Sequence, residues 1–498
     1  MGEAQGSLFE PEFNRAIKVQ ATDQRITSNA GALLLREADH RLGLVESLSQ
    51  RILDPRDPDC IRYNVCELLR ERLYAMALGY QAQDDLDRLA HDPAMRMAVW
   101  DRPGEEVVQE RLASQPTHSR LIAMLAEIPQ NREALRESLC DWTHRHLRSA
   151  SDHAVMRATI DIDSFPIVVH GQQQGGRYNG YYRETVYHPL VASFSVGGDY
   201  DSTLVGLRLG SGFLHAVLRQ GQVHTSQGVV RFLRNVVRKA PALARSFDFR
   251  IDAGLISGKM MDELTDQKLR FCGRLKSNAV LQRLAAPYVY RPPGRPPAGG
   301  YEYVVELGKY QAEGWRHAQR LILVVVDKPD AKTGQLDLFP RYFFLVTNWT
   351  EEERNGEEVL DHYRPRGTFE DRLGEFQQAI GAHLSSEEFH YNEVTLLLIL
   401  LAYNLASLLR IELEDDLGGC WDLSRFQNSV LKAGGKVVKH ARRLCLHVAQ
   451  SVVPLWQRMV ARIRRLRLAS RWAPPRGARR RTWVPPPAHA HLTEVLRL

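Results

Sequence analysis

The sequence has few of the features that mark secreted, disulfide-bonded or membrane-spanning proteins. Its 498 residues include only six cysteines, and none forms a Cys-x-x-Cys pair, which argues against a disulfide framework and a structural zinc site. The longest apolar run, Val394 to Leu409, is interrupted by Asn404 and Ser407, so we predict a buried core helix there. The first residues show neither a basic leader nor an apolar core, so we expect a cytoplasmic protein without a secretion signal.

Acidic residues are missing from one segment near the C-terminus. Lys432 to Arg481 contain fifteen Lys or Arg residues and no Asp or Glu, which gives this segment a charge of +15. The whole chain carries +7, so subtracting the segment leaves −8 for the remaining residues. Such a local excess of positive charge predicts binding to a polyanion, with a solvated tail that binds nothing as the alternative.

The remaining composition, 44% hydrophobic and 25% charged, is typical of a globular protein. Apolar residues at helical spacing, broken by turns that contain proline, predict an all-helical region up to about residue 150. Beyond it, β-branched runs predict strands and amphipathic segments predict helices between them. We expect strands at 157–165, 189–194, 202–209, 247–251, 270–275, 301–307, 320–326 and 342–347, and helices at 225–239 and 258–268.

Three acidic residues occupy positions at which a chain can hold a carboxylate in a fixed place. Asp163 lies in a predicted strand, Asp252 lies at the end of another, and Glu370 lies near the start of a long helix. Because functional groups gather beyond the carboxyl ends of strands in an open sheet, the two aspartates could converge. Three convergent carboxylates repel one another unless cations are present, as in a two-metal site that acts on a phosphodiester. Asp161 is an alternative to Asp163, because residues two apart in a strand point to the same face.

Each of these acids also has a purely structural interpretation. An Asp at a strand end is often a turn residue, and a Glu near a helix N-terminus complements the helix dipole. The context of Glu370 favours a site, because polar groups recur around it at helical spacing, although Pro365 and Gly367 indicate that regular helix starts only after Arg366. A phenol, a guanidinium, a carboxylate and an amide fall within an arc of roughly 60° on an ideal helix: Tyr363, Arg366, Glu370 and Gln377.

The motif Tyr363-x-x-Arg366-x-x-x-Glu370 resembles the signature around the third catalytic acid of the DDE-type transposases of bacterial insertion sequences. Further blocks match insertion-sequence family 1380 in order, and the match runs from about residue 25 to 410. These blocks lie at 27–44, 78–80, 112–117, 161–164, 170–172 with 180–182, 221–224 and 250–254.

This resemblance implies an α/β protein with an RNase H-like catalytic core and a β-rich insertion. An all-helical DNA-binding region would precede the core, and a basic helical tail would follow it. The implied layout is an N-terminal arm at 1–24, a helical DNA-binding and dimerisation region at 25–150, the first part of the core at 151–276, the β-strand insertion at 277–350, the second part of the core at 351–415 and a basic helical DNA-binding tail at 416–498.

The resemblance also implies roles for single residues. The catalytic acids that hold two Mg²⁺ ions, for which Mn²⁺ can substitute, fall on Asp163, Asp252 and Glu370. Positions that contact DNA near the cut fall on Tyr363, Arg366 and Gln377. The family usually has Lys in place of Gln377 and commonly has Thr in place of Phe165.

Further contacts are expected around the core and in the tail. Trp315 and Trp349 are candidates for stacking on a flipped base, with burial in a β core as the alternative. The resemblance also implies active-site support from three residues at motif positions of the family, His170, Gln172 and His224. In the tail we expect DNA contacts from Arg462, Arg464, Arg465, Arg467, Arg471, Arg479, Arg480 and Arg481.

The implied activity is that of an insertion-sequence transposase, which binds the terminal inverted repeats of its element, cuts the DNA and joins the 3′-ends to target DNA. The expected partners are these two kinds of double-stranded DNA and a second copy of the chain, as a homodimer on DNA, without a membrane. We expect a bacterial cytoplasmic protein associated with the nucleoid. The alternatives are a stand-alone nuclease and a transposase-derived DNA-binding protein that does not cut, although pure binding gives no reason for three convergent carboxylates.

Overall fold

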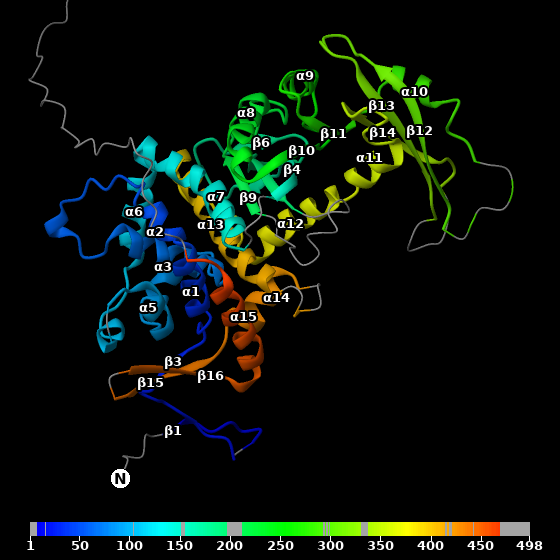
Figure 1. The fold of residues 1–498 in the computed structure, drawn as a ribbon. Coiled ribbons are helices and arrows are strands. Elements are labelled where there is room, and N and C mark those ends of the chain that lie inside the picture. The colour runs from blue at the N-terminus through cyan, green and yellow to red at the C-terminus, as the bar shows by residue number, and fades with distance from the viewer. Residues whose placement is uncertain are drawn as a thin grey trace, which may run out of the picture.

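The computed structural model describes most of the chain between residues 7 and 468. Within this range it leaves out residues 15, 103, 151–154, 197–211, 292–293, 295–296, 298, 330–336, 414–415, 418–420 and 442. A helical unit and a mixed β-sheet with its own helices lie next to each other (Figure 1). The protein is therefore of mixed α/β class, as the sequence predicts.

The helical unit combines N-terminal helices with helices from the C-terminal part of the chain. Its first helices are α1 (Ala32–Leu42), α2 (Leu44–Ser49), α3 (Val65–Ala77), α4 (Asp85–Leu89), α5 (Pro93–Val99), α6 (Gln115–Glu127) and α7 (Pro129–Ala150). The long helix α13 (Phe389–Glu412) packs against α3, α6 and α7 and shares one apolar core with them. By length and composition α13 could cross a membrane, but most of its apolar stretch is buried inside the protein, as predicted for a core helix.

Parallel strands form the centre of an eight-stranded sheet with the order β12-β13-β14-β11-β10-β4-β8-β9. The parallel strands are β4 (Val155–Ser164), β10 (Ala244–Ile251) and β11 (Arg270–Leu275). Beside β4 lie the antiparallel strands β8 (Leu190–Ser195) and β9 (Gly212–Val217). On the other side, β11 pairs with β14 (Arg341–Thr347), followed by β13 (Gln319–Asp327) and β12 (Tyr301–Tyr310). The three strands predicted between residues 301 and 347 therefore extend the same sheet, whereas the strand predicted at 202–209 falls outside the described residues.

Alternation along β4 decides which face of the sheet carries polar groups. Ile160 and Ile162 face an apolar core that they share with α8 (Val229–Lys239) and α9 (Gly258–Asp266). Because side chains in a strand alternate between faces, Asp161 lies on the opposite face. That face meets α11 (Gly356–Tyr363) and α12 (Arg366–Ala379), which are separated by Arg364 and Pro365.

The basic segment after residue 432 contains a β-hairpin that the sequence analysis did not predict. β15 (Gly435–His440) pairs with β16 (Arg443–Val448) and with β3 (Arg25–Thr27). The β-branched pair in the middle of β15 is the local signal for a strand. The following helix, α15 (Val453–Arg465), agrees with the predicted basic helix and buries Met459 and Ile463 in the core of the helical unit. Up to residue 468, the basic segment is therefore packed against the N-terminal region.

Smaller elements complete the described part of the chain. They are β1 (Ser7–Phe9), β2 (Val19–Gln20), β5 (Ile167–Val168), β6 (Arg177–Asn179), β7 (Glu184–Tyr187), α10 (Ala279–Ala285) and α14 (Leu423–Phe426). Of these, β5, β7 and β6 form a separate three-stranded sheet.

Candidate active site

Asp161 and Asp163, the two alternatives for the first acid, have different surroundings. Asp161 is fully buried, and Arg250 donates to both of its oxygens, from Nε at 2.9 Å and from Nη2 at 2.7 Å. Arg250 is also the register partner of Asp161 on the neighbouring strand β10. A buried, bidentate pair of this kind fixes both side chains and satisfies the carboxylate within the protein.

Asp163 lies at the C-terminal end of β4, where the sheet edge begins. Its side chain is 15% exposed, and its Oδ1 accepts a hydrogen bond from the backbone N–H of Ser164 at 2.7 Å. The Nη2 of Arg366, the first residue of α12, donates to Oδ2 of Asp163 at 2.5 Å. The Nη1 of the same, almost fully buried guanidinium lies 3.8 Å from Oδ1 of Asp161. Arg366 therefore connects both aspartates to the start of α12.

Asp252 and Glu370 lie close to Asp163. Asp252 directly follows β10, which runs parallel to β4, so both strands deliver an aspartate to the same edge of the sheet. Glu370 lies in the first half of α12 and is exposed. The pKa of Asp163 is raised to about 6, mainly by burial and further by the nearby charges of Asp252 and Glu370, whereas Arg366 and the hydrogen bond from Ser164 limit the rise. The three carboxylates are thus near enough to repel one another.

The arrangement does not bring the carboxylates to the short separations of a formed metal site. Among the described residues, no group of three or more His, Cys, Asp or Glu side chains could hold one metal ion. Asp252 instead accepts a hydrogen bond from the backbone of Gly254 at 2.9 Å, which is the turn interaction considered as its structural alternative.

The predicted polar arc around Glu370 is divided between two helices. Tyr363 is the last residue of α11, whereas Arg366, Glu370 and Gln377 belong to α12. Burial raises the pKa of the Tyr363 phenol, and the nearby charge of Asp252 adds to the rise. Gln377 is exposed, and its Nε2 donates to the carbonyl of Pro166 at 3.4 Å, close to the end of β4. Regular helix at Glu370 therefore begins at Arg366, as Pro365 and Gly367 indicated, so the angular estimate for one continuous helix does not extend to Tyr363.

A buried network below the sheet edge was missed by the sequence analysis. Asp248 on β10 accepts a hydrogen bond from Oγ1 of Thr159 at 3.0 Å and lies 3.2 Å from Nε2 of His362. Nη1 of Arg250 also donates to the carbonyl of His362 at 3.3 Å, so two residues of β10 hold the last turn of α11. The spacing of Asp248, Arg250 and Asp252 was the available signal, because alternate residues of a strand share a face.

Of the two tryptophans considered for base stacking, Trp349 is buried and Trp315 is half-buried against the core. The ring of Trp315 lies against Gly258, where a Cβ would come within 2.5 Å of its Cδ1, and meets Tyr310 edge-on at 5.6 Å. Trp349 is 2% exposed and meets the ring of His362 at 5.0 Å. These surroundings correspond to the alternative of a β-core position, and DNA contact by Trp315 stays a prediction.

The expected support residues lie on exposed segments. His170 and Gln172 follow β5 and are exposed, and His224 is exposed with its Nδ1 2.8 Å from Oγ of Ser226. Their roles stay predictions.

The basic residues of the tail differ in their surroundings. Nη2 of Arg462 lies 3.1 Å from Oδ2 of Asp416, whereas Arg464, Arg465 and Arg467 are exposed at and beyond the end of α15. Four of the predicted DNA contacts lie outside the described residues: Arg471, Arg479, Arg480 and Arg481.

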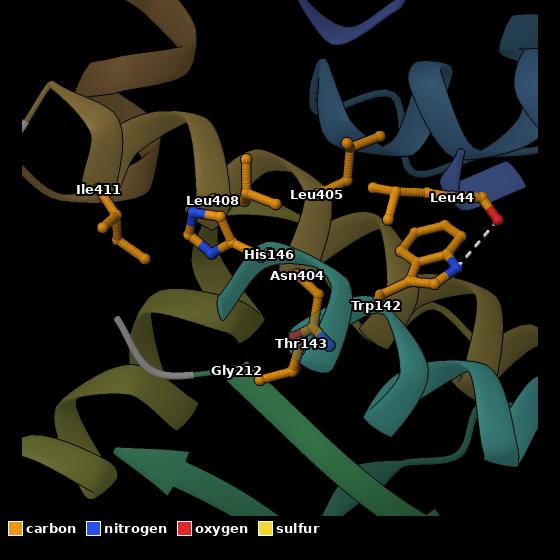
Figure 2. Close-up of a pocket in the computed structure, with 9 residues that line it drawn as sticks. All are labelled: Leu44, Trp142, Thr143, His146, Gly212, Asn404, Leu405, Leu408 and Ile411. Atoms are coloured by element: carbon orange, nitrogen blue, oxygen red, sulfur yellow. Dashed lines mark hydrogen bonds between the residues drawn. The ribbon is translucent and has the colours of Figure 1, made fainter. Parts of the chain in front are cut away.

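A small cavity of about 30 Å³ lies between the helical unit and the sheet, away from the carboxylates. Figure 2 shows its lining: Leu44, Trp142, Thr143, His146, Gly212, Asn404, Leu405, Leu408 and Ile411. The indole of Trp142 donates to the carbonyl of Leu44 at 3.1 Å, and Asn404 is held by Phe213 through two backbone hydrogen bonds. With room for about one water molecule and mostly apolar walls, this cavity is a packing defect rather than a substrate site.

Comparison with protein families identifies the class of the whole chain. The family described as transposase DDE domain group 1 matches residues 9–468, which include the sheet, the helical unit and the three carboxylates. A comparison with curated proteins finds no match. Because the family match spans nearly the entire chain, the protein belongs to the DDE transposase domain family.

Proposed function

We propose that this protein is an insertion-sequence transposase that cuts DNA at the terminal inverted repeats of its element and joins the 3′-ends to target DNA. The observation that carries the proposal is the gathering of Asp163, Asp252 and Glu370 beyond the carboxyl ends of β4 and β10. Membership of the DDE family supports a nuclease or transposase activity in general.

We further propose that the sheet contains an RNase H-like core. Three observations support it: β4, β8 and β9 form a consecutive antiparallel set, β10 and β11 continue in parallel on the other side of β4, and the acids follow β4 and β10. In this proposal β12, β13 and β14 are an insertion between the core strands and the helix that carries Glu370.

Two Mg²⁺ ions are the proposed cofactors, with Mn²⁺ as a substitute. Carboxylate oxygens are the ligands that Mg²⁺ prefers, so Asp163, Asp252 and Glu370 fit it chemically. Cations would offset their mutual repulsion, which adds to the effect of burial on the pKa of Asp163. When bound, such ions activate the attacking oxygen and stabilise the leaving oxygen of a phosphodiester.

The residues around the carboxylates position the DNA in this proposal. Arg366 holds the Asp163 carboxylate at the end of β4, and in this proposal Arg366 and the nearby Tyr363 would contact phosphate oxygens near the cut. Gln377 offers an amide donor on the exposed side of α12. Exposed arginines after α15 would bind the phosphate backbone of the DNA away from the cleaved bond. Two copies of the chain would hold the two element ends together in the cytoplasm of a bacterium.

A paired substitution on α12 tests the function. Purified protein is incubated with Mg²⁺ or Mn²⁺, a target plasmid and a labelled duplex that carries the DNA flanking the coding sequence. We expect cutting followed by joining for the natural protein, and loss of both by about 10³-fold in Glu370→Gln, since metal-ion catalysis is worth several kcal/mol.

The matched control is Asp371→Asn, which removes one negative charge from the neighbouring exposed position of the same helix and should leave activity unchanged. Cutting without joining would favour a stand-alone nuclease. Tight binding without cutting under either metal would favour a DNA-binding protein derived from a transposase.

A further inference from the structure

The small sheet next to β4 carries exposed aromatic rings close to the carboxylates. β5 follows β4 after only Phe165 and Pro166, so the sheet of β5, β7 and β6 lies next to the strand end that holds Asp163. Tyr178 on β6 is 63% exposed, and Tyr181 in the turn between β6 and β7 is 87% exposed. Two large rings in water on one short hairpin are a candidate contact surface.

Tyr182, in the turn between β6 and β7, links the exposed rings with the surroundings of the carboxylates. Burial raises the pKa of Tyr182, and the charges of Asp163 and Asp252 raise it further, which places this phenol near both acids. The ring of Tyr181 meets that of Tyr182 edge-on at 5.0 Å. One ring contact therefore separates the exposed Tyr181 from the surroundings of the carboxylates.

The turn is held in one conformation. Oδ1 of Asn179 accepts from the backbone N–H of Tyr181 at 3.0 Å, and its Nδ2 donates to the carbonyl of Gly221 at 2.7 Å. A Cβ at Gly221 would lie 2.0 Å from the carbonyl oxygen of Val186, so only glycine allows the two segments to touch. A ring positioned in advance loses little conformational entropy when it contacts a ligand.

The charges around the turn match a nucleic acid. Arg177 and Arg183 flank the exposed ring and are themselves exposed, whereas Glu184 is the one acidic residue between positions 168 and 188. Cations that meet phosphates, combined with rings that stack on bases, are typical of proteins that bind nucleic acid with unstacked bases.

We propose that Tyr181 stacks on the nucleobase at the DNA end, next to the phosphodiester that is cut. This inference rests on the DNA-cutting function proposed above. Cutting leaves a terminal base with one open face, and the Tyr181 ring, one ring contact away from the surroundings of the carboxylates, can cover that face whatever the base, because every base has a π-face.

A fluorescent base at the DNA end tests the contact without any cutting. The full-length protein is titrated, in EDTA, into a 20-base-pair blunt duplex with 2-aminopurine at the terminal position and into a second duplex with 2-aminopurine at the centre. We expect a change in fluorescence at the terminal position only. Tyr181→Phe should retain it, and Tyr181→Ala should lose it and weaken binding of the end by about tenfold, in the range measured for base–aromatic stacking.

Tyr290→Ala is the matched control, since Tyr290 is 58% exposed and lies beyond α10. Thermal unfolding checks that each variant is folded. A terminal signal that is unchanged in Tyr181→Ala, or lost equally in Tyr290→Ala, would overturn the stacking inference while DNA binding stands. Absence of duplex binding by the natural protein would overturn the inference together with the proposed function.

Discussion

The middle and the end of β4 hold carboxylates in different surroundings, although a buried arginine donates to each. In the middle, Asp161 is fully buried and receives two hydrogen bonds from Arg250. At the end, Asp163 is near Asp252 and Glu370, and Arg366 opposes the repulsion among the three. A protein that needed only a stable sheet would gain nothing from the second arrangement, because like charges held together oppose folding. The comparison therefore separates a carboxylate that is paired within the sheet from carboxylates for which we propose a cation as partner.

The largest effect on stability is expected from Asp161→Asn. Removing one partner of a buried ion pair leaves the Arg250 charge uncompensated, which should lower the free energy of unfolding by about 3–5 kcal/mol. Asp163→Asn should behave differently. The pKa of Asp163 is raised to about 6, so its contribution to stability is complete below the unfolded value near 3.8 and is lost as pH rises through about 6.

Urea unfolding of both variants at pH 5 and pH 8 measures the contrast. Relative to the natural protein, Asp163→Asn should be more stable at pH 8 than at pH 5, whereas Asp161→Asn should be strongly destabilised at both. Equal losses in the two variants would show that β4 does not distinguish its middle from its end.

The sequence predicted the elements of this sheet better than the partners of their side chains. Strand 270–275 was predicted at its observed bounds, and 247–251 forms the end of the observed β10, because short β-branched and aromatic runs between turns are a local signal. Asp161 and Asp163 stayed alternatives, because a period of two places both on one face. What distinguishes them is the register that sets Arg250 opposite Asp161, and register is a contact between segments about 90 residues apart.

Two further features depended on packing between distant segments. The hairpin of β15 and β16 was not predicted, because the many basic residues of its segment were interpreted only as a polyanion-binding tail. In addition, β15 pairs with β3, which comes from the other end of the chain. The expected helical arc around Glu370 assumed one helix, although Pro365 was noted as a break. The identities of the three acids came from strand ends and a motif, whereas their mutual distances required the folded chain.

A buried histidine at the other edge of the sheet gives an intermediate effect that depends on pH. Burial lowers the pKa of His215 well below its usual value, and the nearby charges of Lys239 and Arg136 lower it further. Below about pH 6.5 the His215 side chain binds a proton in the unfolded chain but stays neutral in the folded chain. The free energy of unfolding therefore falls as pH decreases, by at most about 1.4 kcal/mol per pH unit.

His215→Gln should remove this slope. The free energy of unfolding of both proteins is measured in urea at pH 7.5 and pH 5.5. Lowering the pH should destabilise the natural protein more than the variant. An identical pH dependence in both proteins would mean that His215 is protonated inside the fold, and that the sheet tolerates a charge at β9 without a carboxylate partner.

The smallest effect on stability, and the sharpest test of the tail, compares two pairs of arginines on and near α15. Arg458 and Arg462 lie 3.7 Å and 3.1 Å from the carboxylate of Asp416, whereas Arg464 and Arg465 are exposed at the end of the helix. Each phosphate contact contributes about 0.9 to the slope of log K against log salt on duplex DNA. Replacing both exposed arginines with Gln should therefore lower the slope by about 2, with a change in unfolding free energy within about 0.5 kcal/mol.

Replacing Arg458 and Arg462 with Gln removes the same charge from the same helix and serves as the matched control. If these two side chains are held in ion pairs with Asp416, the salt slope of DNA binding should change less than for the exposed pair. The double substitution should instead lower the free energy of unfolding. Equal slopes for the two double variants would mean that only total charge matters, and a slope unchanged in both would assign the basic segment to the packing of β15, β16 and α15 rather than to DNA.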